Sequence, residues 1–245
     1  MTHPVPSDSQ RAAIEAEPQP LLVLAGPGAG KTYCLIERIR FLVDKRGFDP
    51  ARICAFTFTN KAAGEIASRL QKHIGQKAER IKRGTIHAFC AELLREFGQQ
   101  VGLEPGFGIA DEDYQLLVLR RIEGPRKWHR QVLTRFSAHR FCGEELKHND
   151  RILYETYRDF LTRRNLLDFD MLVLKTAELV RVAEVAEEVR SRWDAVLVDE
   201  FQDLNPVQYM VIRSLSLGHN NIFAVGDDEQ SIYSWAGADP QVFLT

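Results

Sequence analysis

The sequence predicts an α/β fold in which a parallel sheet is covered by helices and interrupted by an all-helical insertion. Short apolar runs alternate with helical patterns at both ends of the chain, as in parallel sheets. A glycine-rich turn joins the first such run to a helix. The alternation stops between about residues 98 and 192, where only helical patterns occur. A chain of 245 residues with 44% hydrophobic composition suits one large or two modest domains.

The strand-like runs lie near 20–25, 52–58, 83–86, 194–199 and 221–226. Helical patterns follow most of them, near 31–45, 60–73, 87–100 and 206–217. In the interrupted part the helices are expected near 111–123, 127–139, 150–164 and 169–190, with no clear strand. We therefore expect a discontinuous sheet domain, residues 1–97 and 193–245, and an insertion, residues 98–192, that a glycine-rich stretch introduces.

Composition excludes some classes of function. The net charge of −2 leaves no global basic signature, so nucleic-acid binding would need local patches. Two basic runs, 69–83 and 120–140, fit such patches, although a charge run is more often a solvated helix face. Four widely spaced cysteines without a Cys-x-x-Cys pattern indicate reduced thiols in a cytosolic protein, with no zinc or iron–sulfur framework. No apolar run is long enough for a membrane span, and the N-terminus is not a signal peptide.

The glycine-rich turn is the most specific local signal. It reads Gly26-Pro27-Gly28-Ala29-Gly30-Lys31-Thr32, between an apolar strand and a helix. Glycines let backbone amides wrap an anion, and the following helix N-terminus adds its dipole. In such a P-loop Lys31 would reach the β- and γ-phosphates and the Thr32 hydroxyl would bind Mg²⁺. The alternative is an ordinary strand-to-helix turn.

A second apolar strand ends in two adjacent acids, Asp199 and Glu200. In a P-loop fold an Asp at this position holds Mg²⁺, and the neighbouring Glu can orient and deprotonate the attacking water. Adjacent side chains on a strand point to opposite faces, so the two acids can do different work. A solvated acidic turn is the alternative, and the P-loop upstream disfavours it.

Several further segments occur in a specific order. They are Ser9-Gln10, Ala55-Phe56-Thr57-Phe58-Thr59-Asn60-Lys61-Ala62-Ala63, Gly84-Thr85-Ile86-His87-Ala88-Phe89, Leu167-Asp168-Phe169-Asp170, Val198-Asp199-Glu200-Phe201-Gln202-Asp203 and Val225-Gly226-Asp227-Asp228-Glu229-Gln230-Ser231-Ile232-Tyr233-Ser234-Trp235. This series resembles the UvrD/Rep/PcrA family of superfamily 1 DNA helicases over nearly the whole chain. The match looks like the first RecA-like domain of that family with its helical insertion.

The resemblance implies an ATP- and Mg²⁺-dependent 3′→5′ translocase on single-stranded DNA and single-strand/duplex junctions, acting in repair or replication in the bacterial cytosol. Gln10 would contact adenine, because an amide can pair with an adenine edge in both directions. Gln202 would sense nucleotide or help to place water. Gln230 would contact the γ-phosphate and report hydrolysis to the DNA side.

The resemblance also implies a set of DNA-facing residues. They are Phe58, Thr59, Asn60, Lys61, Thr85, His87, Tyr233 and Trp235. These residues follow predicted strands, where an α/β sheet presents its loops to ligands. Aromatic rings such as Phe58 and Trp235 could stack on bases without sequence preference. Taken alone, aromatics at strand ends are more often core residues.

Two positions depart from the family pattern: Tyr33 and Ala236 stand where relatives usually have Arg. The chain also stops at Thr245, where the family's second RecA-like domain should follow with its arginines. We therefore expect an N-terminal fragment that binds nucleotide, hydrolyses ATP poorly and unwinds nothing alone. The alternatives are a stand-alone regulatory module that binds ATP and DNA, or part of a RecB/AddA-type helicase–nuclease.

Overall fold

A computed structural model describes residues 5–227 of the chain. Five strands form one parallel sheet in the order β1-β7-β6-β2-β3. The strands are β1 (Leu21–Leu24), β2 (Ile53–Thr57), β3 (Lys82–Thr85), β6 (Ala195–Val198) and β7 (Ile222–Gly226). Each of them lies within or next to a predicted strand, so the α/β parallel-sheet prediction is confirmed.

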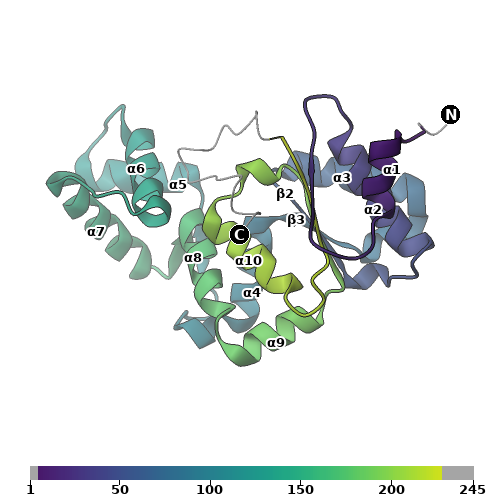
Figure 1. Cartoon of the computed structure of the whole chain (residues 1–245). Helices are drawn as coiled ribbons and strands as arrows, with labels where there is room; N and C mark the ends of the chain where they lie inside the picture. The colour runs from purple at the N-terminus through teal and green to yellow at the C-terminus, as the bar shows by residue number, and fades with distance from the viewer. Residues whose placement is uncertain (1–4, 228–245) are drawn as a thin grey trace.

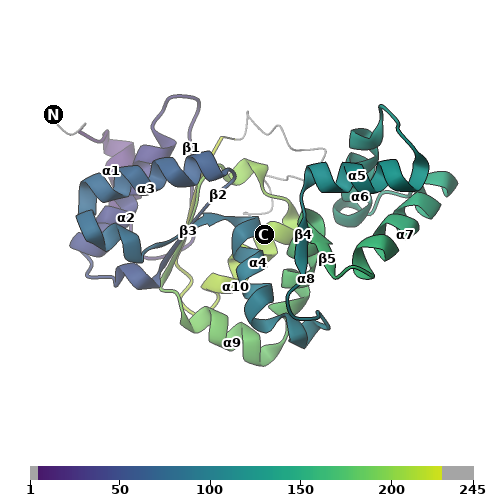
Figure 2. The ribbon, with the colours of Figure 1, turned by 180° about the vertical axis from the view of Figure 1, so that it is seen from behind.

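Helices cover both faces of this sheet (Figures 1 and 2). One face carries α1 (Asp8–Glu15), α2 (Lys31–Asp44) and α3 (Asn60–Ile74), and the other carries α4 (Ile86–Phe97), α8 (Phe169–Leu179) and α10 (Pro206–Ser216). Alternate residues of one strand enter the two hydrophobic cores: Ile53 and Ala55 of β2 pack on the α2–α3 side, and Cys54 and Phe56 on the α4–α8 side. This period of two is what a sheet buried on both faces requires.

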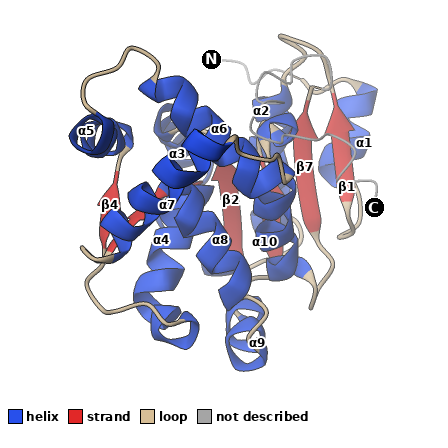
Figure 3. Ribbon diagram, turned by 90° about the vertical axis from the view of Figure 1, so that its left-hand side faces the viewer, coloured by secondary structure: helices blue, strands red, loops and turns tan. Residues whose placement is uncertain are grey.

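A third hydrophobic core belongs to helices set to one side of the sheet (Figures 1 and 3). It is built by α5 (Glu112–Glu123), α6 (His129–Cys142) and α7 (His148–Thr162) around Phe136 and Tyr157. The prediction that this part has no strand is wrong, because β4 (Gly108–Ala110) and β5 (Leu166–Asp168) form a parallel pair. Strands of three residues are too short to show alternation in a sequence.

The single helix expected over 169–190 is two helices, α8 and α9 (Ala183–Ser191), with a turn at 180–182 between them. Leu172 and Val173 of α8, with Val185 and Val189 of α9, pack in the same core as α4 and α10. The domain boundaries at 98 and 192 stay a prediction, and this packing favours a narrower insertion that runs from β4 to β5.

Short 3-10 helices link several elements: η1 (Pro50–Arg52), η2 (Gly75–Arg80), η3 (Gly98–Val101) and η4 (Phe201–Asp203). The four cysteines form no disulfide; Cys34, Cys54 and Cys90 are buried, whereas Cys142 is exposed. None of the helices between residues 5 and 227 combines the length and the apolar character needed to cross a membrane.

Candidate nucleotide-binding site

The predicted phosphate-binding residues meet at one edge of the sheet. Strand β1 leads into the glycine-rich turn, β6 leads into Asp199, and β7 leads into Asp227. Because β7 pairs with both β1 and β6 in parallel register, the three strand ends lie side by side. Ligands of open α/β sheets bind at this carboxyl edge.

The glycine-rich turn has the backbone of an anion cradle. Gly28 and Gly30 have φ of 73° and 86°, a region that residues with a Cβ rarely adopt. Gly30 is the N-cap of α2 and offers no side chain to the first amides of the helix. Those amides are therefore available to a phosphate at the positive end of the helix dipole.

Lys31 lies buried beneath this turn. Its Nζ donates to the carbonyl oxygen of Ala25 at 3.1 Å and forms an ion pair with Asp227 Oδ2 at 3.2 Å. The side chains of Lys31 and Asp227 are 9% and 2% exposed. Sequence reasoning did not include Asp227 among the site residues, although it directly follows a strand, as Asp199 does.

Thr32 and Asp199 converge from α2 and β6. The Thr32 hydroxyl donates to Asp199 Oδ2 at 3.3 Å. Adjacent oxygen ligands of an octahedral Mg²⁺ lie about 3 Å apart, so this pair fits two positions around the ion. In the described part of the chain no group of three His, Cys, Asp or Glu side chains could hold a metal by itself. A Mg²⁺ here would therefore need phosphate and water ligands as well, as it does in nucleotide sites.

Burial controls the protonation of the acids. It raises the pKa of Asp199 to about 6, and the nearby Glu200 carboxylate adds to the effect. The pKa of Asp203 is raised to about 6 by the same two causes. One oxygen of Asp203 is buried without a hydrogen-bond partner in the described structure, so this acid is a further polar group of the site that the sequence did not single out. A bound cation would favour the ionised form of these carboxyls.

Gln202 connects two strand ends. Its Nε2 donates to Glu200 Oε2 at 2.8 Å, and its Oε1 accepts from the Asp227 amide at 2.9 Å. Glu200 has a φ of 51°, which is uncommon for a residue with a Cβ. With this backbone, the Glu200 carboxylate accepts the hydrogen bond from Gln202.

Gln10 holds the start of the chain against the glycine-rich turn. Its Oε1 accepts from the Ser7 amide at 2.9 Å, which completes a capping box at the start of α1. Its Nε2 donates to the carbonyl oxygen of Ala29 at 2.9 Å. Gln10 therefore lies beside the turn, and its contact with adenine stays a prediction. Tyr33 lies next to the same turn, since its Cβ is 3.7 Å from the position that a Cβ on Gly30 would take.

Six of the expected DNA-facing residues follow the two neighbouring strands β2 and β3. Thr59 and Thr85 are the N-caps of α3 and α4, and their hydroxyls accept from Ala62 and Ala88 amides at 3.1 and 3.2 Å. Asn60 and Lys61 are exposed, and Phe58 is partly buried.

His87 packs edge-on against Phe169 at 5.3 Å between ring centroids. Burial lowers the pKa of His87, so the ring is neutral at pH 7. Gln230, Tyr233, Trp235 and Ala236 lie outside the described residues. Among the described residues, the strand order places the phosphate and metal candidates at β1, β7 and β6, and the DNA candidates at β2 and β3.

Comparison with known proteins shows the family to which the chain is similar. A family model described as the UvrD/REP helicase N-terminal domain matches residues 7–245. The ATP-dependent DNA helicase PcrA of Staphylococcus aureus (strain Mu50) is 36% identical over 257 residues, covering 96% of this chain and 35% of the relative. The protein of the same name from Staphylococcus epidermidis (strain ATCC 12228) is 35% identical over 260 residues, covering 98% of this chain and 35% of the relative.

The chain thus spans 35% of the length of these curated relatives. The family match covers nearly all of the chain, and it includes both the sheet and the helices inserted in it. The chain belongs to the UvrD/REP helicase N-terminal domain family.

Proposed function

We propose that this chain is the ATP- and single-stranded-DNA-binding N-terminal part of an ATP-dependent 3′→5′ DNA helicase that acts in repair or replication. The observation that carries the proposal is the convergence of Lys31, Thr32 and Asp199 at one sheet edge, with the DNA candidates on the adjacent strands. A second RecA-like domain of the parent protein would complete the motor. Such a protein would act on single-strand/duplex junctions in the bacterial cytosol.

The residues at the edge have separate roles in this proposal. The turn amides and Lys31 bind the β- and γ-phosphates, and Gln10 contacts adenine after releasing Ala29 or Ser7. Thr32 and Asp199 would hold Mg²⁺, which would neutralise charge at the phosphates. Glu200 orients the attacking water and accepts its proton, while Gln202 fixes the Glu200 carboxylate. Gln230 would contact the γ-phosphate.

A short backbone path joins the two halves of the edge. The Asp199 amide donates to the carbonyl oxygen of Phe56 at 2.8 Å, and Phe56 lies two residues before Phe58. A shift of Asp199 on phosphate release would therefore displace the end of β2, from which the Phe58–Lys61 segment begins. Through this contact, ATP hydrolysis would change how the Phe58–Lys61 segment binds DNA.

The test is Mg²⁺-dependent binding of a fluorescent ATP analogue, with ATP hydrolysis measured in the presence and absence of an oligothymidylate. Lys31→Ala should weaken nucleotide binding by about 100-fold, because a buried charge-assisted contact to phosphate is lost. Glu200→Gln should keep binding and lose hydrolysis. Lys77→Ala is the matched control, because Lys77 is an exposed lysine paired with Asp44. Unchanged binding in Lys31→Ala would overturn the assignment of the nucleotide site.

A further inference from the structure

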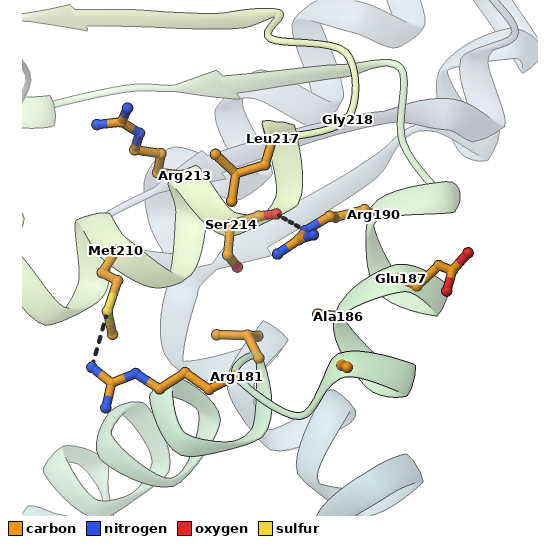
Figure 4. Close-up of a pocket in the computed structure, with 11 residues that line it drawn as sticks. Arg181, Ala186, Glu187, Arg190, Met210, Arg213, Ser214, Leu217 and Gly218 are labelled. Atoms are coloured by element: carbon orange, nitrogen blue, oxygen red, sulfur yellow. Dashed lines mark hydrogen bonds between the residues drawn. The ribbon is translucent and has the colours of Figure 1, made fainter.

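A hollow of about 840 Å³ lies between α9, α10 and the turn that follows α8 (Figure 4). Its apolar lining includes Val180, Ala186, Met210 and Leu217. Leu217 is 52% exposed and adjoins the other apolar side chains of this lining, so it is part of a patch and not an isolated exposed residue. In the part of the chain that the structure describes, the hollow therefore offers apolar surface at the side of the sheet domain.

The rim of the hollow is positively charged, with Arg181, Arg190 and Arg213 against one carboxylate, Glu187. Figure 4 shows Arg181 and Arg190 reaching toward α10, where they contact Met210 Sδ at 3.5 Å and the Ser214 carbonyl oxygen at 3.2 Å. A thioether is a weak acceptor, and neither contact neutralises a charge.

Within residues 5–227 none of these three arginines forms an ion pair. Arg192, which follows Arg190 closely at the end of α9, shows the contrast, since Glu96 and Glu188 both pair with it. Glu96 and Glu188 are thus used by Arg192, and the rim of the hollow keeps three guanidinium groups for another partner.

The hollow is far from the nucleotide site in the fold. Helix α10 follows the carboxyl end of β6 and runs back, so that Leu217 and Gly218 precede the start of β7. The hollow therefore lies toward the amino ends of the parallel strands, opposite to the edge that holds Lys31 and Asp199. A partner bound there would leave nucleotide and DNA free to bind.

We propose that this hollow docks an acidic segment of a partner protein, with an apolar side chain on the floor and carboxylates on the arginines. Guanidinium groups pair with carboxylates in bidentate geometry, and apolar anchors in pockets surrounded by charge are typical of peptide recognition. A nucleic-acid backbone would fit the arginines but would gain nothing from the apolar floor and would be repelled by Glu187.

The experiment is selection of twelve-residue peptides from a random phage-displayed library on the immobilised full chain, followed by fluorescence anisotropy with the enriched peptides. We expect enrichment of a Leu, Phe or Met flanked by Asp and Glu. The double variant Arg181→Glu/Arg213→Glu should weaken binding of these peptides by about 100-fold, and Leu217→Asn should weaken it by about 10-fold. Arg151→Glu/Arg163→Glu, two exposed arginines of α7 and its C-terminal end with the same charge change, should have no effect.

Nucleotide binding by the Arg181→Glu/Arg213→Glu variant should be unchanged, which shows that the chain is folded. Equal binding of selected peptides to this variant and to the unmodified chain would overturn the proposal, as would a library that yields no pocket-dependent peptide. Displacement of the peptides by an oligothymidylate would assign the hollow to nucleic acid instead. Self-association that the double variant abolishes would assign it to a second copy of the chain.

Discussion

Lys31 in the candidate nucleotide site and Arg140 at the base of the helical insertion are both buried cations beside carboxylates, but they are held differently. Lys31 donates to one carbonyl oxygen and to one carboxylate, that of Asp227. Arg140 donates from Nη1 to both oxygens of Asp168 and to Asp170, and from Nε to the Tyr154 hydroxyl.

The surroundings of the two cations differ as well. Burial alone would lower the pKa of Arg140, but Asp168 and Asp170 raise it above its usual value. Tyr157 and Ser137 donate to the same two acids, at 2.9 and 2.7 Å. The Lys31 ammonium sits on a flexible stem with one carboxylate partner, whereas Arg140 is fixed in a network that joins α6 to β5 and α8. The Lys31–Asp227 ion pair is suited to exchanging its carboxylate for another anion. The network around Arg140 is suited to holding α6 against β5 and α8.

The largest effect is expected from breaking the network around Arg140. Arg140→Met should lower the free energy of unfolding by about 3–5 kcal/mol, because Asp168 is left buried without its cation. Arg135→Met is the matched control, since Arg135 is a half-exposed arginine of the same helix paired with Asp150, and it should cost no more than about 1 kcal/mol. Urea denaturation measures both. Equal losses in the two variants would contradict the structural role of Arg140.

A smaller effect, of opposite sign, is expected in the nucleotide site. Folding raises the pKa of Asp199 from 3.8 to about 6, so the folded chain binds a proton that the unfolded chain has lost between these pH values. The contribution of Asp199 to the free energy of unfolding therefore falls as pH rises from about 4 to 6 and stays low above that range. Asp199→Asn should remove this penalty and stabilise the chain by about 1–3 kcal/mol at pH 7, while Mg²⁺-dependent hydrolysis is lost.

Urea denaturation at pH 4.5, 5.5 and 7 measures the change, with the exposed Asp113→Asn as control. Asp203 should keep part of the pH dependence in Asp199→Asn, because its pKa is raised in the same way. Loss of stability at pH 7 in Asp199→Asn would show that the carboxylate is a structural group, as Asp168 is, and would remove the distinction between the two clusters.

The contact between Gln202 and the end of β7 gives a third test. A Cβ on Gly226 would lie 2.7 Å from Gln202 Oε1, which also accepts from the Asp227 amide. Gly226→Ala should therefore displace Gln202, cost about 1–2 kcal/mol of stability and reduce hydrolysis more than nucleotide binding. Gly64→Ala in α3 is the control, because no atom lies within 4 Å of its Cβ position, and it should stabilise the chain by up to about 1 kcal/mol. Normal hydrolysis in Gly226→Ala would exclude a positioning role for Gln202.

The two regions also differ in how much of them the sequence could predict. Strands β2, β6 and β7 are buried apolar runs bounded by polar turns, and their ends carry the chemistry, so the motifs alone could place Thr32 and Asp199 in one site. The sheet-forming segments repeat one strong pattern, and parallel pairing brings their carboxyl ends to one edge.

The insertion has weaker sequence signals. Helix α6 has apolar residues distributed around its whole circumference, so its pattern does not show which face is buried. Strands β4 and β5 have only three residues each, so neither strand could be detected from the sequence. Arg140, Asp168 and Tyr157 come from separate elements, and only the tertiary packing brings them together. Asp227, the partner of Lys31, directly follows β7, but the motif at that strand end assigns its roles to later residues such as Gln230, so the sequence did not single out Asp227.

The smallest expected effect separates capping from DNA contact by comparing helix starts in the two regions. Thr59 caps α3 and Asp111 caps α5, each by accepting from an amide three residues ahead. Replacing either residue by Ala should cost about 1 kcal/mol of stability, because one helix amide loses its partner. If Thr59 also contacts phosphate, Thr59→Ala should weaken oligothymidylate binding measured by anisotropy, whereas Asp111→Ala should not, and Thr59→Ser should restore both properties. Equal DNA affinity in the Thr59→Ala and Asp111→Ala variants would mean that Thr59, like Asp111, only caps its helix. The DNA contact after β2 would then be assigned to Asn60 and Lys61.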